Sequence, residues 1–497
     1  MVWSAFALLV TLSAVPVFST VLPPLLDYPN HLARMHLLAE GGDAFYSVHW
    51  ALLPNLAEDL IVPPLARVMP LEVAAKLFLV MIFSLMAGGV IWLNRVATGA
   101  WRLWPLLGFL FLYNRILLWG FVNYLFGIGV ALVGIASWLA LEGRCRWIRV
   151  PSSSLVALAC FFSHIAAFGF YTLVIIGIEL LPAVGELRAR QWPALGRRIA
   201  IGLPQFVAPA ALWLSVRHDA PTGTVSYAAL WRKVDLLFSV FDNYNRAFDV
   251  VCFTLFLALI GGLLWTRRLG LTPRLAAAVG IVFAVYLLLP SQIYGGSGAD
   301  HRLPTGLFLL LVAATAPRFP SSFVAAAVGL VAALVLVVRL GMIERFWSAA
   351  DQVYSADLVG IDALPQASKL AVAHPADLFH VVPIPEVHLP VLAISRREVF
   401  VPTLFAVKGQ QPVALKPAFA ALADAAQPQC LWAILMGVQG ADQVPLPSIL
   451  AQFDFVAFID KRPIGLPPHR CLAPVFVQAT FQIYAVSHNL DCAGTDG

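Results

Sequence analysis

Ten long apolar segments dominate the first 341 residues and leave little of that region for an ordinary charged surface. They fall at residues 2–24, 71–93, 101–119, 121–141, 150–183, 199–216, 248–266, 275–290, 303–316 and 323–341. A helix needs about 20 apolar residues to cross a hydrocarbon layer of roughly 30 Å, and the segments do not alternate as barrel strands do. Only 12% of the 497 residues are charged. The sequence therefore predicts an α-helical polytopic membrane protein.

The segment at 150–183 is too long for one ordinary crossing, because as a single helix it would extend about 50 Å at about 1.5 Å per residue. Arginine clusters that begin at Arg144 and Arg188 flank its two ends, and basic flanks favour the cytoplasm. We therefore expect a short helical hairpin that turns near Ser163 and His164. The chain would then have about eleven membrane helices, with the N-terminus in the cytoplasm and the C-terminus outside.

Residues 2–24 lack a basic stretch before their apolar run, so we interpret them as a retained first helix rather than a cleaved signal peptide. Three polar segments then lie outside the membrane, at 25–70, 217–247 and 291–302. Irregular polar backbone cannot face lipid, so these loops face water or line a cavity.

Beyond residue 342 the long apolar runs end. We expect a transmembrane domain over 1–342, with its long first outer loop at 25–70, and an extracytoplasmic α/β domain over 343–497. In the second domain, 368–373, 397–407, 453–460 and 481–487 are predicted to be strands, and 416–426 and 446–453 helices. Its cysteines, Cys430, Cys471 and Cys492, either include one disulfide or are all free thiols.

Three polar residues, Asp27, His31 and Arg34, follow directly on the first apolar segment. Pro29 suits a first helical turn, and residues 29–42 are predicted to form a helix that lies along the membrane surface and ends at two glycines. His31 and Arg34 then share a face, and the helix dipole favours an ionised Asp27. An ionised Asp27 suits a general base or a metal ligand, and Arg34 suits a phosphate. The alternatives are a helix cap, an imidazole at the headgroup level and a snorkelling arginine.

Further candidates for substrate binding lie in other segments. Asp300, His301 and Arg302 follow flexible glycines at the outer end of an apolar segment, where a cation would grip a lipid phosphate. Arg115 interrupts the third apolar segment and either lines a cavity near the outer face or snorkels to it. We expect Asp27, Arg34 and Arg302 to meet in one outward-facing cavity.

An acid directly after the first helix, followed by two surface helices in a long outer loop, resembles the GT-C superfamily of integral-membrane glycosyltransferases. The resemblance implies a polyprenyl-phosphate sugar as donor, a lipid or glycan acceptor, and a place in the bacterial inner membrane with the C-terminal domain in the periplasm. It implies that Asp27 is the base or binds a divalent metal, Mg or Mn. The sequence departs from the superfamily's common Asp-Glu pair, because Tyr28 follows Asp27.

Other functions are less consistent with the sequence. A single acid in the first outer loop favours inversion by direct displacement over a mechanism with two acids. The motifs GxxxxGK[ST], HExxH and GxSxG are absent, and no basic run with interleaved aromatics suggests nucleic acid. The rival interpretation is a non-enzymatic transporter or a scaffold for envelope polysaccharide or lipid assembly. A transporter is expected to show matching broken helices in two repeats, and the sequence has no such repeat.

Overall fold

The computed structural model describes residues 1–144, 146–215, 225–293, 296–378, 385–406, 409–437, 449–467 and 470–488. The chain forms two compact units, which are treated separately below. The first unit comprises Met1–Phe18, Leu52–Glu58 and Lys76–Arg345. The second comprises Ser19–Ala51, Asp59–Ala75 and Phe346–Gly497, so most of the first outer loop groups with the C-terminal part of the chain.

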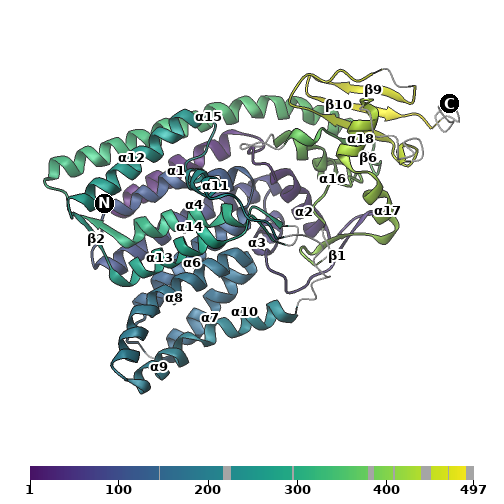
Figure 1. Cartoon of the computed structure of the whole chain (residues 1–497). Coiled ribbons are helices and arrows are strands. Elements are labelled where there is room, and N and C mark those ends of the chain that lie inside the picture. The colour runs from purple at the N-terminus through teal and green to yellow at the C-terminus, as the bar shows by residue number, and fades with distance from the viewer. Residues whose placement is uncertain are drawn as a thin grey trace. The chain divides into compact units, whose positions relative to one another are not determined.

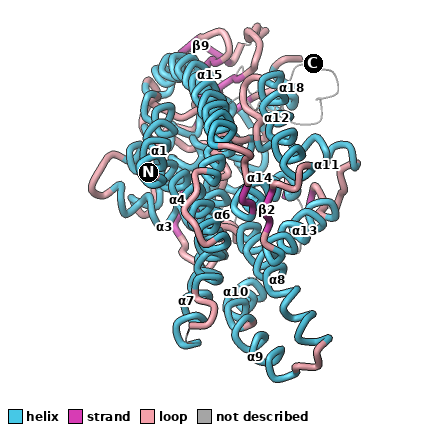
Figure 2. Tube along the Cα trace, turned by 90° about the vertical axis from the view of Figure 1, so that its left-hand side faces the viewer, coloured by secondary structure: helices cyan, strands magenta, loops and turns pink. Residues whose placement is uncertain are grey.

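The first unit consists mainly of helices (Figure 1), and Figure 2 shows how few strands accompany them. It contains the helices α1 (Val2–Ser19), η1 (Trp104–Phe111), α5 (Arg115–Leu118), α6 (Val122–Ala140), α7 (Arg146–Ser163), α8 (Ile165–Arg188), α9 (Trp192–Gly202), α10 (Pro204–Ser215), α11 (Leu230–Leu237), η2 (Phe238–Val240), α12 (Arg246–Trp265), α13 (Pro273–Leu288) and α14 (Ala299–Ala314), and most of α4 (Leu71–Thr98) together with the first part of α15 (Ser322–Asp362). Its strands form two antiparallel pairs, β2 (Leu269–Leu271) with β5 (Thr315–Pro317) and β3 (Gln292–Ile293) with β4 (Gly296–Ser297).

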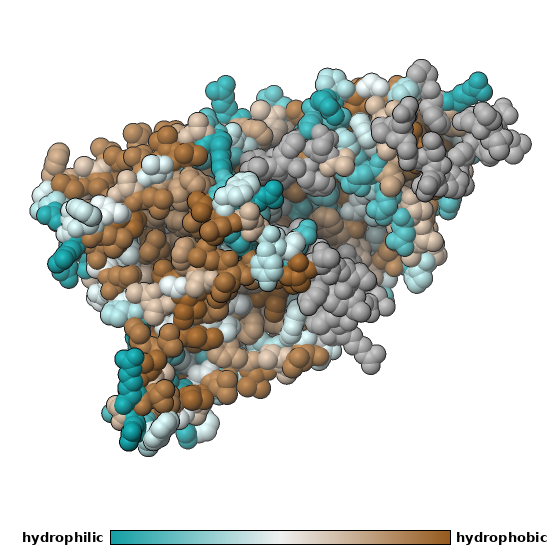
Figure 3. Space-filling model, viewed as in Figure 1, coloured by the Kyte–Doolittle hydropathy of each residue, from teal (hydrophilic) through white to brown (hydrophobic). Residues whose placement is uncertain are grey.

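Six helices within the described residues are long and apolar enough to cross a membrane: α1, α4, α6, α8, α12 and α15. The remaining predicted segments form shorter or interrupted helices, so the number of about eleven crossings stays a prediction. Apolar side chains such as Leu214, Leu288 and Leu330 are exposed, and Figure 3 shows apolar residues spread over the visible face of these helices. A surface of this kind is expected where helices face lipid.

The predicted break in the 150–183 segment is confirmed. α7 ends at Ser163 and α8 begins at Ile165, with His164 in an extended conformation between them. The Nδ1 atom of His164 accepts a hydrogen bond of 3.0 Å from the backbone N–H of Ala166. A helix start leaves N–H groups without backbone partners, so this imidazole caps α8 within an apolar segment.

The third predicted crossing is a 3-10 helix, η1, followed by the four-residue α5. The side chain of Asn114 accepts hydrogen bonds from the backbone of Ile116 and Leu117, at 2.9 and 3.1 Å. It also donates one of 2.7 Å to the carbonyl of Phe111. Asn114 therefore satisfies backbone groups at the junction, which allows the helix to break in buried surroundings.

Small residues allow α8 and α13 to pack closely side by side. A Cβ atom on Gly177 would lie only 2.3 Å from the Cα atom of Ala278. Any side chain at residue 177 would therefore force the two helices apart. Close backbone approach at small residues is a general way for helices to associate in membranes.

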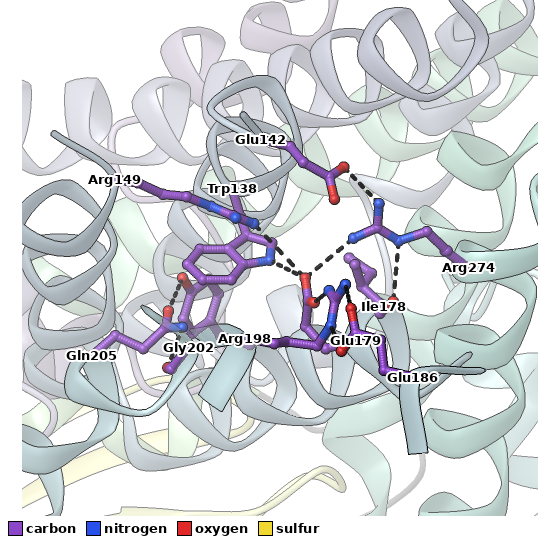
Figure 4. Close-up of polar contacts among 11 residues, drawn as sticks. Trp138, Glu142, Arg149, Ile178, Glu179, Glu186, Arg198, Gly202, Gln205 and Arg274 are labelled. Carbon is purple, nitrogen blue, oxygen red and sulfur yellow. Dashed lines mark hydrogen bonds and ion pairs between the residues drawn. The ribbon is translucent and has the colours of Figure 1, made fainter. Parts of the chain in front are cut away.

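A network of arginines and glutamates joins the ends of α6, α7, α8, α9 and α13 (Figure 4). Glu179 is its centre: it accepts hydrogen bonds from Trp138 Nε1 at 2.8 Å and Arg274 Nη2 at 3.1 Å, and one from Arg198. The guanidinium carbon of Arg149 lies 3.7 Å from the centroid of the Trp138 ring. Arg149 and Arg198 belong to the two arginine clusters that flank the 150–183 segment, and both contact Glu179, so the two flanks lie together as the predicted hairpin requires.

Peripheral contacts extend this network at both ends. Arg274 Nη1 donates a hydrogen bond of 2.6 Å to Glu142, and Arg198 donates two, of 3.0 and 2.6 Å, to Glu186. Three arginines therefore face three glutamates, counted over the residues of Figure 4. Such networks hold helix ends together more firmly than isolated surface pairs, which contribute about 0–1 kcal/mol.

The second unit contains a four-stranded sheet in the order β6-β8-β10-β9, in which β6 and β8 are parallel and the other pairs antiparallel. The strands are β6 (Leu370–Ala373), β8 (Phe455–Ile459), β9 (Leu472–Val477) and β10 (Phe481–Val486). The helices of this unit are α2 (Tyr28–Glu40), α3 (Ala57–Ala66), η3 (Ala376–Leu378), η4 (Pro385–Val391), α16 (Leu392–Arg397), α17 (Pro417–Ala425) and α18 (Pro428–Leu435).

The first outer loop is tied to the C-terminal part of the chain by a second, two-stranded sheet. β1 (Tyr46–Val48) pairs antiparallel with β7 (Val413–Leu415). The hydroxyl of Tyr46 donates a hydrogen bond of 2.6 Å to the carbonyl of Val401. Two segments more than 350 residues apart in sequence therefore share one hydrophobic core.

Most of the predicted C-terminal elements are present. The strands at 368–373, 453–460 and 481–487 are confirmed as β6, β8 and β10, and the helix at 416–426 as α17. The strand at 397–407 is wrong, because α16 ends at Arg397 and Glu398 takes a left-handed φ of 55°. Only a single parallel bridge, from Lys369 to Phe400, remains there. The helix predicted at 446–453 lies partly outside the described residues, and β9 was not expected.

Among the cysteines of the second unit, Cys430 is an exposed free thiol and Cys471 is disulfide-bonded. Cys492 lies outside the described residues. Of the two alternatives left open by the sequence, a disulfide therefore applies to Cys471 and a free thiol to Cys430.

Candidate functional site

Asp27 stands at the N-terminus of α2, as the sequence predicts. It is the N-cap residue, Pro29 lies in the first turn, and Gly41 ends the helix in a left-handed conformation. The Asp27 side chain makes no capping hydrogen bond to the helix and is 13% exposed. The carboxylate therefore stands at the positive end of the helix dipole, where the ionised form is favoured.

His388, from η4, is a neighbour of Asp27 that the sequence does not predict. Its Nε2 atom lies 3.8 Å from Oδ1 of Asp27. Burial, with smaller contributions from His374 and His31, lowers the pKa of His388 to about 3. At neutral pH the imidazole is therefore uncharged, and it places a neutral polar group rather than a cation beside the carboxylate.

Arg34 is buried and forms an ion pair with Asp59 of α3. Nε of Arg34 lies 2.8 Å from Oδ1 of Asp59, and their side chains are 2% and 0% exposed. Nη2 of Arg34 lies 3.1 Å from Nδ1 of His31. Because arginine can only donate, Nδ1 of His31 accepts, and the proton of a neutral His31 ring stands on Nε2. Asp59 thus fixes Arg34, and Arg34 fixes the tautomer of His31.

The apolar face of α2 packs against protein rather than lipid, so the position of the helix along the membrane surface stays a prediction. Leu32, Met35 and Leu38, the proposed lipid-facing residues, are buried. α16 and η4 pack against the helix. The amide oxygen of Asn30 accepts a hydrogen bond of 3.0 Å from the backbone of Phe405. The apolar face of α2 packs into a protein core. A helix that packs on a core and a helix that faces lipid have the same apolar sequence pattern.

Arg115, in the first unit, neither snorkels nor lines an open cavity. It is 4% exposed and forms an ion pair with Asp242, which also pairs with Arg246. Arg246 in turn pairs with Asp235. A buried arginine in an apolar region needs such a partner, since an uncompensated charge there costs several kcal/mol, about 3–5 when one partner is removed.

Asp300 and Lys233 form a second buried pair in the first unit. Nζ of Lys233 lies 2.9 Å from Oδ2 of Asp300, with side chains 2% and 0% exposed. Nζ also donates hydrogen bonds to the carbonyls of Tyr286 and Leu289. The pair therefore connects the second predicted outer loop to the third.

His301 and Arg302 follow Asp300 in the first turn of α14. The ring of His301 stacks on Trp119, with centroids 4.9 Å apart. Nη1 of Arg302 donates a hydrogen bond of 2.8 Å to the carbonyl of Gly298, and its guanidinium lies 4.7 Å from the centroid of Phe121. Gly298 has a φ of 70°, a conformation that favours glycine.

A cavity of about 490 Å³ lies beside this cluster. The two outer loops line it together, with Ser226, Tyr227, Ala228, Ala229, Trp231, Arg232, Ser291, Gln292, Gly298 and His301. Pockets that bind small molecules have volumes of roughly 300–1,000 Å³, so this one is large enough to hold a ligand.

The structure thus groups the predicted residues in two clusters, one in each unit. Asp27, His31 and Arg34 gather with Asp59 and His388, as described. The cluster in the first unit holds Asp300, His301 and Arg302. Arg115 belongs to a separate ion pair, with Asp242. Because Asp27 and Arg302 belong to different units, the expectation that they share one cavity stays a prediction.

Several members of these clusters were not predicted. Asp59 and Lys233 lie in stretches that read as amphipathic surface helices, but their charged side chains are buried. His388 lies 361 positions after Asp27 in the printed sequence, and no local pattern connects the two. Asp242 was one charge among several in a polar loop.

A divalent metal does not fit the residues around Asp27. Within the described ranges, no group of three or more His, Cys, Asp or Glu side chains is arranged to hold a metal ion. Nε2 of His388 lies 3.8 Å from Oδ1 of Asp27, and among the described residues no third His, Cys, Asp or Glu side chain completes a ligand set with this pair. We therefore derive no step through a metal.

One solved structure matches the chain along its whole length: the crystal structure of ArnT from Cupriavidus metallidurans bound to undecaprenyl phosphate. The match has a TM-score of 0.52 and 13% sequence identity, and it covers 100% of both chains. No protein-family model and no curated protein sequence matches. At this identity the likeness shows that the chain has an ArnT-like fold.

Proposed function

We propose that the protein is a membrane glycosyltransferase that moves a sugar from a polyprenyl-phosphate donor to a lipid or glycan acceptor. The reaction would take place at the periplasmic face of a bacterial inner membrane. The observation that carries the proposal is the full-length fold match to ArnT, which was crystallised with undecaprenyl phosphate. The six helices long enough to cross a membrane, counted over the described residues, support a membrane location.

Asp27 is the general base of the proposed reaction. The acceptor hydroxyl attacks the anomeric carbon and transfers its proton to the Asp27 carboxylate. The bond between that carbon and the phosphate oxygen breaks, and the electron pair leaves with the lipid phosphate. Direct displacement of this kind inverts the configuration. The helix N-terminus supports the ionised carboxylate that a base requires.

Arg34 and His31 have different parts in this scheme. We assign the substrate contact to His31, whose Nδ1 accepts a hydrogen bond from Arg34. Arg34 is a positioning residue, because its charge is already compensated by Asp59. The original expectation that Arg34 binds the phosphate directly is therefore replaced by this indirect role.

The candidates for the cation that binds the leaving phosphate are the arginines predicted from the sequence. Arg302 is the primary candidate, since a planar guanidinium matches phosphate oxygens in a bidentate manner. Arg115 is a positioning residue by the same criterion as Arg34, because it is buried and Asp242 compensates its charge. Asp300 and His301 complete the proposed binding group, Asp300 by holding Lys233 and His301 by lining the cavity.

The experiment compares the purified wild type with Asp27→Asn in the presence of polyprenyl-phosphate sugars and candidate acceptors. Removal of a general base is expected to lower transfer by about 10²–10⁴-fold. Asp424→Asn, at an exposed aspartate in α17, is the matched control and is expected to retain transfer. Equal transfer by Asp27→Asn and the wild type would exclude Asp27 as the base. Solute movement without consumption of a lipid-linked sugar would favour the transporter instead.

A further inference from the structure

We propose that the cavity between the second and third outer loops binds the sugar of the acceptor, and that this sugar carries a phosphate or another acidic group. The inference rests on the proposed function, because it assigns one substrate of that reaction to a particular pocket. The cavity of about 490 Å³ lies wholly within the first unit.

The lining offers the groups that a carbohydrate needs. Ser226 and Ser291 supply hydroxyls and Gln292 an amide. These three are already ordered among themselves: the hydroxyl of Ser226 donates to the amide oxygen of Gln292 at 3.1 Å, and Ser291 donates to the Ser226 carbonyl at 3.0 Å. A ligand with several hydroxyls would meet donors and acceptors in fixed positions, which lowers the entropy cost of binding.

Two aromatic rings stand at the entrance of the cavity. Tyr227 and Trp231 are 68% and 67% exposed, although both line it. Large rings exposed at a pocket of polar groups offer flat apolar faces, and a pyranose ring has a matching face of C–H bonds. The rings therefore favour a sugar over a linear polar ligand.

The charge of the lining favours an acidic ligand. Arg232 contributes a guanidinium, and none of the ten described lining residues is a carboxylate. The adjacent Asp300 does not line the cavity and is paired with Lys233. A phosphate or carboxylate on the sugar would gain charge-assisted hydrogen bonds from Arg232 without repulsion from a neighbouring acid.

The same features indicate that the ligand of this cavity is the acceptor sugar rather than the lipid chain of the donor. A polyprenyl chain would require a continuous apolar lining, and this cavity is lined by hydroxyl, amide, imidazole and guanidinium groups. Its aromatic rim is exposed and therefore accessible to a headgroup. The geometry thus fits the carbohydrate part of an acceptor.

The test measures binding to the purified full-length protein in detergent by isothermal titration calorimetry, with three probes: a hexose 1-phosphate, the free hexose and inorganic phosphate. The wild type is expected to bind the sugar phosphate at least about tenfold more tightly than either fragment, because it combines both kinds of contact. Arg232→Gln should remove the preference for the phosphorylated sugar. Trp231→Ala should weaken the sugar and the sugar phosphate together.

Matched controls are Arg67→Gln and Trp265→Ala, which change an exposed arginine and an exposed tryptophan that do not line the cavity. Both should bind all three probes as the wild type does. The proposal is overturned if the wild type binds the three probes equally, or if Arg232→Gln keeps the preference.

Because no donor is present in the binding test, its failure is distinguishable from failure of the proposed function. Asp27→Asn should bind the sugar phosphate normally while it loses transfer. A wild type that transfers sugar but shows no probe preference contradicts the cavity assignment alone. A wild type that binds as expected but transfers nothing supports the cavity's ligand class and contradicts the glycosyltransferase.

Discussion

The ammonium of Lys233 lies 2.9 Å from the carboxylate of Asp300, and both side chains are almost completely buried. One residue comes from the second predicted outer loop and the other from the third. Each charge is costly in these surroundings without its partner, whereas an apolar pair of similar size avoids both desolvation costs. The stability of single and double substitutions of the pair should therefore differ.

Lys233→Met and Asp300→Leu should each destabilise the protein by about 3–5 kcal/mol, because each leaves one buried charge uncompensated. The double variant should be clearly more stable than either single variant. Thermal unfolding in detergent measures all three. Strictly additive losses in the double variant would show that the two side chains do not depend on each other.

Arg34→Lys should lower sugar transfer by about tenfold or more, since one ammonium cannot reproduce the two directed contacts of Arg34 with Asp59 and His31. The pH profile of transfer should shift as well, because the proton on His31 is no longer fixed to one nitrogen. Arg67→Lys, at an exposed arginine of the same outer loop, is the control and should leave both unchanged.

A purely structural role for Arg34 would have a different signature. It would lower the amount of folded protein while the pH profile of the remaining activity stayed the same. That result would contradict the assignment of Arg34 as a positioning residue for His31.

His388 should make the protein sensitive to acid. Burial lowers its pKa to about 3, against about 6.5 in an unfolded chain. Below about pH 6.5 the unfolded state therefore binds a proton that the folded state does not, and stability falls as the pH decreases towards 3. His388→Gln should remove this contribution, which amounts to at most about 1.4 kcal/mol per pH unit.

The measurement compares unfolding of the wild type and His388→Gln between pH 4 and pH 7. The neighbouring Glu386 acts in the opposite direction, because burial raises its pKa. Both proteins contain Glu386, so the difference between them reports His388. Parallel pH curves for the two proteins would contradict the prediction.

His164→Asn should keep the cap at the start of α8, whereas His164→Leu should lose it. Asparagine is a favourable N-cap residue, and removal of a side-chain cap costs about 0.5–2 kcal/mol. Thermal unfolding should therefore rank the wild type and His164→Asn together and place His164→Leu below them. If His164→Leu is as stable as the wild type, the hydrogen bond to Ala166 contributes nothing.

The sequence predicts features that depend on neighbouring residues. The length of the 150–183 segment and its arginine flanks were sufficient to place the break at His164, and Pro29 with two glycines was sufficient for the bounds of α2. In both places a local physical constraint determines the structure. The thickness of the membrane limits the length of the 150–183 segment, and the geometry of helix ends sets the bounds of α2.

Features that depend on distant parts of the chain could not be predicted in this way. Leu32 and Met35 show that α2 has an apolar face, but sequence alone does not tell a lipid partner from a protein partner. The pairs Asp27–His388 and Tyr46–Leu415 join residues separated by most of the chain. At 397–407 the apolar run resembled a strand, and the left-handed turn at Glu398 ends any regular structure there.

The network around Glu179 has a consequence for genetic screens. Glu179 accepts hydrogen bonds from several helix ends at once (Figure 4). Its substitution would therefore lower the amount of correctly inserted and folded protein rather than the turnover rate. In cells, substitutions of Glu179 or Arg198 would abolish sugar transfer because less folded protein is inserted. In a screen they would look the same as loss of a catalytic side chain. Only turnover normalised to the quantity of inserted protein would separate such variants from those of Asp27.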